Sequence, residues 1–111
     1  VIYFLQNKIA KLLEMGVVDV IVDPGFGFSK TVSQNFELLK NLKAFNILGK
    51  PILVGLSRKS MVWRTLAVSP EDALTGTTAL HAAALLNNAS VLRVHDVKEA
   101  AQTIKMISLL R

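Results

Sequence analysis

Apolar residues recur along the chain with two periods, one typical of helices and one typical of buried strands. Helical spacing over residues 2–15 predicts an opening helix that ends at Gly16. The run VVDVIV at residues 17–22 predicts a strand buried on both faces, because it is short and almost continuously apolar. The same reasoning predicts a helix over residues 33–45 and a second buried strand over residues 51–55.

A third helix is predicted from a start signal as well as from its apolar content. In the stretch SPED, residues 69–72, Ser69 suits the N-cap and Pro70 suits the first helical position, with Asp72 three residues after the cap. The apolar run that follows extends the helix through ALHAAALLNN, and Gly76 is expected to break it.

A third strand and a closing helix complete the pattern. SVLRV at residues 90–94 predicts the strand, and DVKEAAQTIKMISLL predicts the helix, with Asp96 and Glu99 spaced as a capping box. One helix followed by three β-α units predicts a parallel sheet covered by helices. The last three βα units of a TIM (β/α)8 barrel have this order, and so does part of a doubly wound sheet. Either sheet would have open edges.

Composition adds one constraint to this α/β picture. Hydrophobic residues make up 51% of the 111 residues and the mean hydropathy is +0.43, which is apolar for a small soluble domain. No apolar run reaches the ~18 residues that span a bilayer. Asp19, His81 and Arg93 interrupt the longest runs. We therefore expect residues 1–111 to be a piece of a larger core.

The charge and cysteine content exclude some classes of protein and disfavour others. The formal net charge is +5, but many lysines lie on predicted helices at spacings that suit solvated faces. This distribution favours an ordinary solvated surface over a nucleic-acid interface. The chain has no cysteine, which excludes disulfides and thiolate metal sites.

Three polar segments directly follow the three predicted strands. They are DPGFGFSK at 23–30, GLSRKS at 55–60 and RVHD at 93–96. In parallel α/β folds, ligands bind at the carboxyl ends of the strands. We therefore expect the three segments to lie on one face of the sheet and to form one site.

The first segment combines a carboxylate, two glycines and two aromatic rings. Gly25 and Gly27 permit positive φ and close backbone approach, and Asp23 is an acceptor suited to paired N–H donors of a heterocycle. Phe26 or Phe28 could form a wall for a flat ring. The structural alternative is that Asp23 caps the turn and the phenylalanines fill the core, and the segment by itself favours that alternative.

The other two segments offer cations. Ser57, Arg58 and Lys59 place a hydroxyl, a guanidinium and an ammonium side by side, which suits an anionic or carbonyl-bearing substrate; the alternative is a solvated loop with serine caps. Arg93 and His95 share one face of the third strand because side chains alternate. An arginine within a strand is costly without a compensating anion, so this pair predicts an anion site.

Taken together, the three segments resemble the dihydropteroate synthase family over nearly the whole chain. The family has an Asp-Pro-Gly-(Phe/Ile)-Gly-Phe-Gly-Lys loop, a Gly-x-Ser-Arg-Lys-Ser loop and an Arg-Val-His-Asp-Val ending, in this order. Here they stand as DPGFGFSK, GLSRKSM and RVHDV. The resemblance implies that residues 1–111 are the C-terminal part of a single pterin-binding TIM-barrel domain. Ser29 and Asn88 stand where the family commonly has glycine, and asparagine tolerates a left-handed backbone.

The resemblance also implies an activity. The family condenses 4-aminobenzoate with 6-hydroxymethyl-7,8-dihydropterin diphosphate, giving 7,8-dihydropteroate and pyrophosphate in folate biosynthesis. Mg²⁺ is implied as the cofactor, with its ligand residue in the absent N-terminal half and no metal ligand in these residues. A cytoplasmic homodimer with small-molecule substrates, and with no nucleic-acid or membrane partner, is implied for the full-length enzyme. Residues 1–111 alone are expected to be inactive.

By matching position, the resemblance assigns the first substrate to all three segments. Asp23 and Lys59 would contact the pterin, and Gly55 would let its ring lie against the backbone. Arg93 and His95 would hold the departing diphosphate, and with Lys59 they form the expected catalytic group. No protein nucleophile is required, since the demand is to stabilise the leaving diphosphate electrostatically.

The resemblance places the second substrate beside the first. Ser57, Arg58 and Phe28 would border the 4-aminobenzoate pocket, where sulfonamides compete. Alternatives to the synthase are a pterin-binding methyltransferase on the same barrel, which would not need the Ser-Arg-Lys loop or a diphosphate site, and a non-catalytic basic binding module. A non-catalytic fragment or assembly partner is a further alternative.

Overall fold

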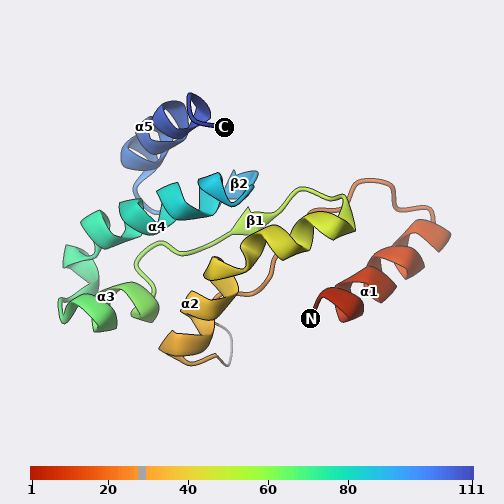
Figure 1. Ribbon diagram of the computed structural model, residues 1–111, viewed down its shortest axis with the longest axis horizontal. Helices are drawn as coiled ribbons and strands as arrows, with labels where there is room; N and C mark the ends of the chain where they lie inside the picture. Colours follow the sequence, from red (N-terminus) through yellow and green to blue (C-terminus); the bar gives the residue numbers. More distant parts are fainter. Residues whose placement is uncertain (28–29) are drawn as a thin grey trace.

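A short parallel sheet crosses the middle of the molecule (Figure 1). The computed structural model describes residues 1–27 and 30–111. Strand β1 (Leu53–Val54) pairs in parallel with strand β2 (Val91–Leu92), with Leu53 opposite Val91. Parallel neighbours need a long crossover, and helices form most of the chain between these two strands. The predicted strands at 51–55 and 90–94 are thus confirmed in type and direction, although each is only two residues long.

The segment predicted as the first strand takes a smaller part in this sheet. Val22 forms one parallel bridge with Ile52, the residue before β1. Val18 and Ile21 are 72% and 57% exposed. The expectation of a strand buried on both faces over residues 17–22 is therefore wrong for this structure. The physical reason is that, within the described residues, no segment pairs with residues 17–21.

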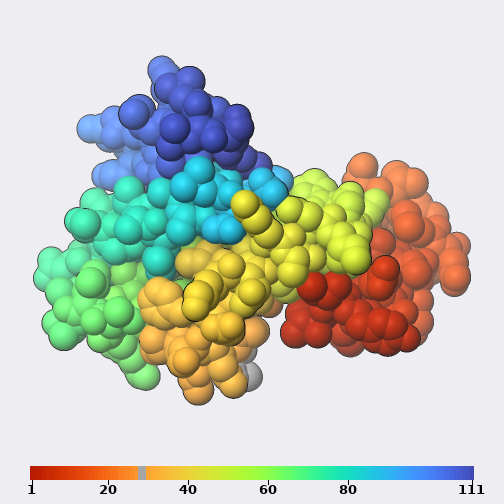
Figure 2. Space-filling view, viewed as in Figure 1, coloured from red at the N-terminus to blue at the C-terminus, as the bar shows by residue number. Residues whose placement is uncertain are grey.

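Helix α1 (Ile2–Glu14) forms where the helical spacing predicts it. Its buried residue is Ile9, and the helix packs against the segment that precedes β1. Gly16 follows the helix with a φ of 91°, which suits its predicted role as the residue that ends the helix. Figure 2 shows α1 in red at one end of the molecule.

The helix predicted over residues 33–45 is two elements. Helix α2 (Val32–Lys40) begins after Thr31, whose hydroxyl accepts from the Gln34 backbone while the Gln34 side chain accepts from the Thr31 N–H. A 3₁₀-helix, η1 (Leu42–Leu48), follows at once. The expectation of one continuous α-helix is therefore corrected.

The hydrophobic spacing explains this correction. Phe36, Leu39, Leu42 and Phe45 recur every three residues, and three residues per turn is the period of a 3₁₀-helix. In η1 this period points both Leu42 and Phe45 into the core, where they are 0% and 3% exposed. The three-residue spacing was therefore a signal for the 3₁₀-helix η1.

The region between β1 and β2 holds three helical elements. Helix α3 (Ser60–Leu66), which the sequence analysis did not predict, follows the second polar segment. The start signal at residues 69–72 forms only the short 3₁₀-helix η2 (Pro70–Asp72). Helix α4 (Leu74–Leu86) begins one residue later, so the interruption lies at Ala73 and not at Gly76.

Gly76 has a packing role inside α4. A Cβ at this position would lie 2.7 Å from Val62 Cγ1 and 2.7 Å from Leu66 Cδ1, both on α3. Atoms this close would clash, so glycine permits α3 and α4 to touch. The break expected at Gly76 is wrong because close helix packing, and not a turn, accounts for this glycine.

Helix α5 (Val97–Ser108) closes the chain and packs against α4 (Figure 1). Asp96 occupies its N-cap position, but the side chain makes no capping hydrogen bond. The capping box expected from Asp96 and Glu99 is therefore wrong. The reason is that the Asp96 carboxylate accepts two hydrogen bonds from the side chain of Arg58.

The core lies between the sheet and the helices α2 to α4. Its largest fully buried apolar side chains come from the first polar segment, η1, the two ends of β1 and α3: Phe26, Leu42, Ile52, Leu56 and Met61. Asn88 has a φ of 74°, the left-handed conformation that asparagine tolerates. Within the described part of the chain, no helix combines the length and apolar character needed to cross a membrane.

Candidate active site

The side chain of Lys59 joins the second polar segment to the first. Its ammonium donates a hydrogen bond to the carbonyl oxygen of Phe26. A Cβ on Gly27, which has a φ of 88°, would lie 3.4 Å from Lys59 Cδ. Glycine adopts this positive φ without strain, and the loop backbone lies against the lysine stem.

Gly55 joins the second segment to the third. A Cβ at this residue would lie 3.4 Å from both Nε and an Nη atom of Arg93, and 3.7 Å from Lys59 Nζ. The two cations therefore flank the same glycine. A cavity of about 180 Å³ opens here, and its lining residues are Gly55, Ser57, Lys59, Arg93, Val94 and His95.

Two cationic side chains, Lys59 and Arg93, lie close together at this cavity. Burial, and then the charge of Arg93, lower the pKa of the Lys59 ammonium, while Asp23 acts in the opposite direction. Within the described residues, no carboxylate forms an ion pair with Arg93. Two cations that repel each other beside a cavity make a site suited to an anion.

Ser57 holds the third segment against the second. Its hydroxyl lies 2.8 Å from Nδ1 of His95 and accepts a hydrogen bond from the His95 backbone at 3.3 Å. Ser57 is buried and His95 is exposed. The contact orients the imidazole ring of His95 at the edge of the cavity.

In the first polar segment, Asp23 caps the turn and Phe26 fills the core, which is the structural alternative to a ligand-binding role. Asp23 Oδ1 accepts from the Gly25 N–H at 2.9 Å, and Lys30 Nζ donates to the Gly25 carbonyl at 2.8 Å. Phe26 is 1% exposed and fills the core, so it forms no wall of the cavity. Asp23 caps the turn but remains exposed and acts on Lys59 through its charge. Phe28 lies outside the described residues.

Asn35 supports this segment and was not singled out from the sequence. It lies on α2, is 2% exposed, and its Oδ1 accepts from the Gly27 N–H at 2.8 Å. A signal was present: Asn35 is spaced four residues before Leu39, so a polar side chain occupies a position on the apolar face of the helix.

Arg58 does not line the cavity. Its guanidinium donates to both carboxylate oxygens of Asp96, at 2.7 Å and 3.2 Å, and the two side chains are 39% and 19% exposed. Hydrogen bonding to this partner raises the pKa of Arg58 and lowers the pKa of Asp96. The structure thus brings Gly55, Ser57 and Lys59 to the cavity and turns Arg58 toward α5.

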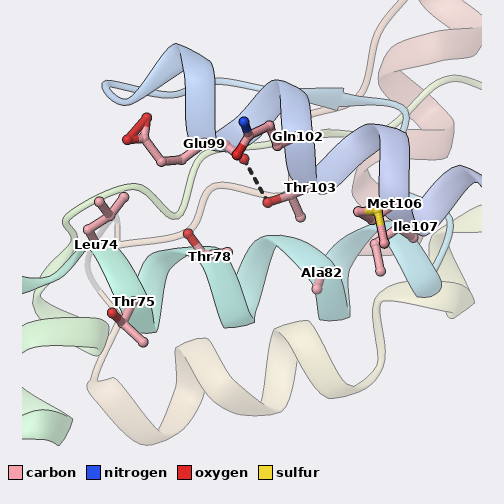
Figure 3. Close-up of a pocket in the computed structure, with 9 residues that line it drawn as sticks. All are labelled: Leu74, Thr75, Thr78, Ala82, Glu99, Gln102, Thr103, Met106 and Ile107. Atoms are coloured by element: carbon pink, nitrogen blue, oxygen red, sulfur yellow. Dashed lines mark hydrogen bonds between the residues drawn. The ribbon is translucent and has the colours of Figure 1, made fainter.

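A larger cavity lies elsewhere. It measures about 540 Å³ between α4 and α5, and Figure 3 shows its lining, which mixes apolar and polar side chains and includes no cation: Leu74, Thr75, Thr78, Ala82, Glu99, Gln102, Thr103, Met106 and Ile107. None of the residues expected for substrate binding lies in it. The smaller cavity at the strand ends is therefore the candidate active site.

His81 on α4 is buried, and among the described residues its Nε2 has no hydrogen-bond partner. Burial lowers the pKa of His81 below its ordinary value of 6.5, while Asp96 acts weakly in the opposite direction. Below pH 6.5 the unfolded chain therefore binds a proton that the folded chain binds less readily, so stability falls as the pH falls toward the pKa of the folded state.

We expect His81→Leu to weaken this acid sensitivity and to raise stability, because it removes an unpaired buried polar atom. Urea unfolding at pH 7.5 and pH 5.5 checks it: the difference between the two free energies of unfolding should be smaller in the variant. Equal differences in the variant and the wild type would contradict the assignment to His81.

Parallel strands joined through helices, with a cationic cavity at their carboxyl ends, define an α/β protein whose cavity at that edge of the sheet suits an anionic ligand. A family model described as "Pterin binding enzyme" matches residues 1–95. The chain belongs to this family, which confirms the resemblance found in the sequence.

Relatives of known name agree with this assignment. The chain is 39% identical over 107 residues to the dihydropteroate synthase of Escherichia coli K12. This match covers 95% of this chain and 38% of the relative. It is 42% identical to a bifunctional dihydropteroate synthase/dihydropteroate reductase of Helicobacter pylori. This second match covers 96% of this chain and 28% of that relative. The chain thus spans less than half the length of these relatives.

Solved structures are similar in fold as well as in sequence. A Coxiella burnetii dihydropteroate synthase in complex with pteroic acid superposes with a TM-score of 0.94 at 38% identity, over 98% of this chain and 41% of that one. A Thermus thermophilus dihydropteroate synthase in complex with 6HMPPP superposes with a TM-score of 0.92 at 36% identity. That superposition covers 99% of this chain and 45% of the Thermus chain.

Proposed function

We propose that residues 1–111 are part of a dihydropteroate synthase, which condenses 4-aminobenzoate with 6-hydroxymethyl-7,8-dihydropterin diphosphate and releases pyrophosphate. The observation that carries the proposal is the pair of cations, Lys59 and Arg93, on either side of Gly55. A diphosphate is an anion of the charge that such a pair attracts. The family and the named relatives support the pterin as the group that bears it.

The proposal extends to the architecture. We propose that the parallel segments at Val22, β1 and β2, with the helices that follow them, are the last three βα units of a TIM barrel and form the C-terminal part of one pterin-binding domain. The segments that follow these strands lie together, as ligand-binding segments do in such barrels. The relatives are longer than this chain, which leaves room for the other units.

We propose the following roles for the residues at the cavity. Arg93 and Lys59 stabilise the charge that grows on the departing diphosphate, which is electrostatic preorganisation. His95, held by Ser57, donates a hydrogen bond to the same group. Asp23, exposed beside Lys59, accepts from the N–H groups of the pterin.

Within the described residues, no three His, Cys, Asp or Glu side chains come together. The family resemblance places the metal ligand outside this chain, and no step here depends on the ion. The lysine and the arginine are the charge-stabilising groups that these residues supply.

Gly55→Ala tests the closeness of the two cations. The added Cβ would sit in ordinary contact with Arg93 and Lys59, and Gly55 has no positive φ, so the fold should be retained. It would occupy the space between the cations where a ligand approaches. We expect roughly tenfold weaker binding of inorganic diphosphate, measured by calorimetry in the full-length protein, with an unchanged melting temperature. Equal affinity in the variant would contradict the placement.

A chimera tests the proposed activity. The segment of the E. coli dihydropteroate synthase that matches this chain over 107 residues is replaced by residues 1–111, and dihydropteroate formation is measured. The unaltered E. coli enzyme is the reference, and the chimera with Arg93→Ala is the control for activity that does not use the site. We expect product from the chimera and little from the control.

A chimera that folds, by circular dichroism and size-exclusion chromatography, and makes no product would overturn the proposal. The alternative of a pterin-binding methyltransferase is tested with the same protein. A synthase binds the pterin diphosphate more tightly than the unphosphorylated pterin, and Arg93→Ala removes the difference. Equal affinities for the two pterins would favour the methyltransferase.

A further inference from the structure

Arg58 has a strained backbone between two residues of the cavity. Its φ is 54°, the left-handed region that residues with a Cβ rarely adopt. Its neighbours in the chain, Ser57 and Lys59, both line the cavity. If Arg58 relaxed to an ordinary conformation, the chain direction would change and both neighbours would move. The position of the lysine ammonium therefore depends on the conformation of a residue outside the cavity.

Two contacts from other elements hold this conformation. The Arg58 N–H donates to Thr77 Oγ1 on α4 at 3.1 Å, and Thr77 is 2% exposed. The Arg58 guanidinium donates to both oxygens of Asp96, which precedes α5. Strained residues persist where their surroundings over-determine them, and these contacts fix both the backbone and the side chain.

Helix capping does not explain the position of the Asp96 carboxylate. Asp96 is at the N-cap of α5 and makes no capping hydrogen bond. An ion pair between an exposed arginine and a partly buried aspartate near the surface adds little to global stability. The pair instead connects the second polar segment to the third. The contact between Ser57 and His95 connects the same two segments.

We propose that Asp96 is a positioning residue, which holds Arg58 in its left-handed turn so that Lys59 and Ser57 face the cavity, and that Arg58 serves this turn without contacting substrate. The inference rests on the proposed function of the site. It differs from the family resemblance, which places Arg58 at the border of the 4-aminobenzoate pocket.

Replacing Arg58 by glycine and by alanine separates the two roles. Both changes remove the guanidinium, but glycine adopts the left-handed conformation without strain and alanine does not. In the full-length protein we expect Arg58→Ala to lower kcat/KM for dihydropteroate formation by about tenfold or more, and Arg58→Gly to stay within about threefold of wild type. If Arg58 contacts 4-aminobenzoate, both variants raise its KM equally, which would overturn the proposal.

Variants of Asp96 test the second residue of the ion pair with Arg58. Asp96→Ala should match Arg58→Ala in activity, Asp96→Glu should recover part of the loss, and Asp96→Ala should add nothing in the Arg58→Gly background. Glu99→Gln is the matched control: it removes one negative charge from the first turn of α5 and should leave activity unchanged. An equal loss in Glu99→Gln would assign the effect to the net charge at this helix.

Hydrogen–deuterium exchange of the peptide over residues 55–60 gives a readout that needs no activity. We expect faster exchange in Asp96→Ala and Arg58→Ala, and wild-type exchange in Glu99→Gln. If the wild-type protein forms no dihydropteroate, the proposed function fails, and the exchange rates alone decide the role of Asp96. Unchanged exchange in Asp96→Ala would overturn the positioning role.

Discussion

Arg93→Ala will lower kcat/KM for dihydropteroate formation in the full-length protein by about 10²- to 10³-fold, the loss expected when a charge-stabilising donor is removed. The guanidinium lies over Gly55 beside Lys59, and no described carboxylate pairs with it. Its removal leaves the departing diphosphate with one fewer cation. Steady-state kinetics and calorimetry with inorganic diphosphate measure the loss of rate and of affinity.

Two further variants separate the effect of the guanidinium at this site from the effect of net charge. Arg93→Lys keeps the charge without the planar fork of donors and should fall between the wild type and Arg93→Ala. Lys98→Ala removes an exposed cation from the first turn of α5, away from the cavity, and should bind diphosphate as the wild type does. A similar loss in Lys98→Ala would show that net charge, and not this site, attracts the anion.

Lys59→Met will lower the same activity by about 10²-fold, because it removes both a cation at the cavity and the donor to the Phe26 carbonyl. Methionine fills a similar volume without the charge, so the comparison isolates the ammonium. Peptides from the loop at residues 23–27 should also exchange hydrogen faster in this variant. Wild-type activity in Lys59→Met would remove the lysine from the proposed mechanism.

The pH profile gives an independent measure of Lys59. Its pKa is lowered by burial first and by Arg93 second, so the cationic form is lost at a lower pH than for an exposed lysine. Activity should therefore decline at alkaline pH. In Arg93→Ala the repulsion is absent, the pKa of Lys59 rises, and the decline should shift to higher pH. An unshifted decline would show that another group causes it.

Local sequence signals were sufficient for much of the fold. The spacing over residues 2–15 and the apolar runs before the second and third polar segments correspond to α1, β1 and β2. The helix prediction succeeded because α1 buries one face at a regular period, and the strand predictions succeeded because short apolar runs are typical of buried strands. Several signals were misinterpreted: among them, the spacing of three before residue 46 indicated a 3₁₀-helix, and Gly76 permits close packing in α4.

The contacts of single polar residues were harder to predict. Asp96 has the spacing of a capping residue, but Arg58 lies 38 positions earlier in the chain and takes its carboxylate. Asn35 binds the Gly27 backbone from a helix that starts after the loop. Such pairings depend on which segments the fold brings together, and residue spacing within one element contains no information about them.

The sequence by itself determined the alternation of helices and strands and the residue types at the ends of the strands, because both follow from local periodicity and chemical character. Only the tertiary structure decided which of these side chains share a cavity. Lys59 and Arg93 meet over Gly55, while Arg58, between Ser57 and Lys59 in the chain, turns away toward Asp96. The left-handed backbone of Arg58, held by Thr77 on α4 and by Asp96 before α5, sets that difference.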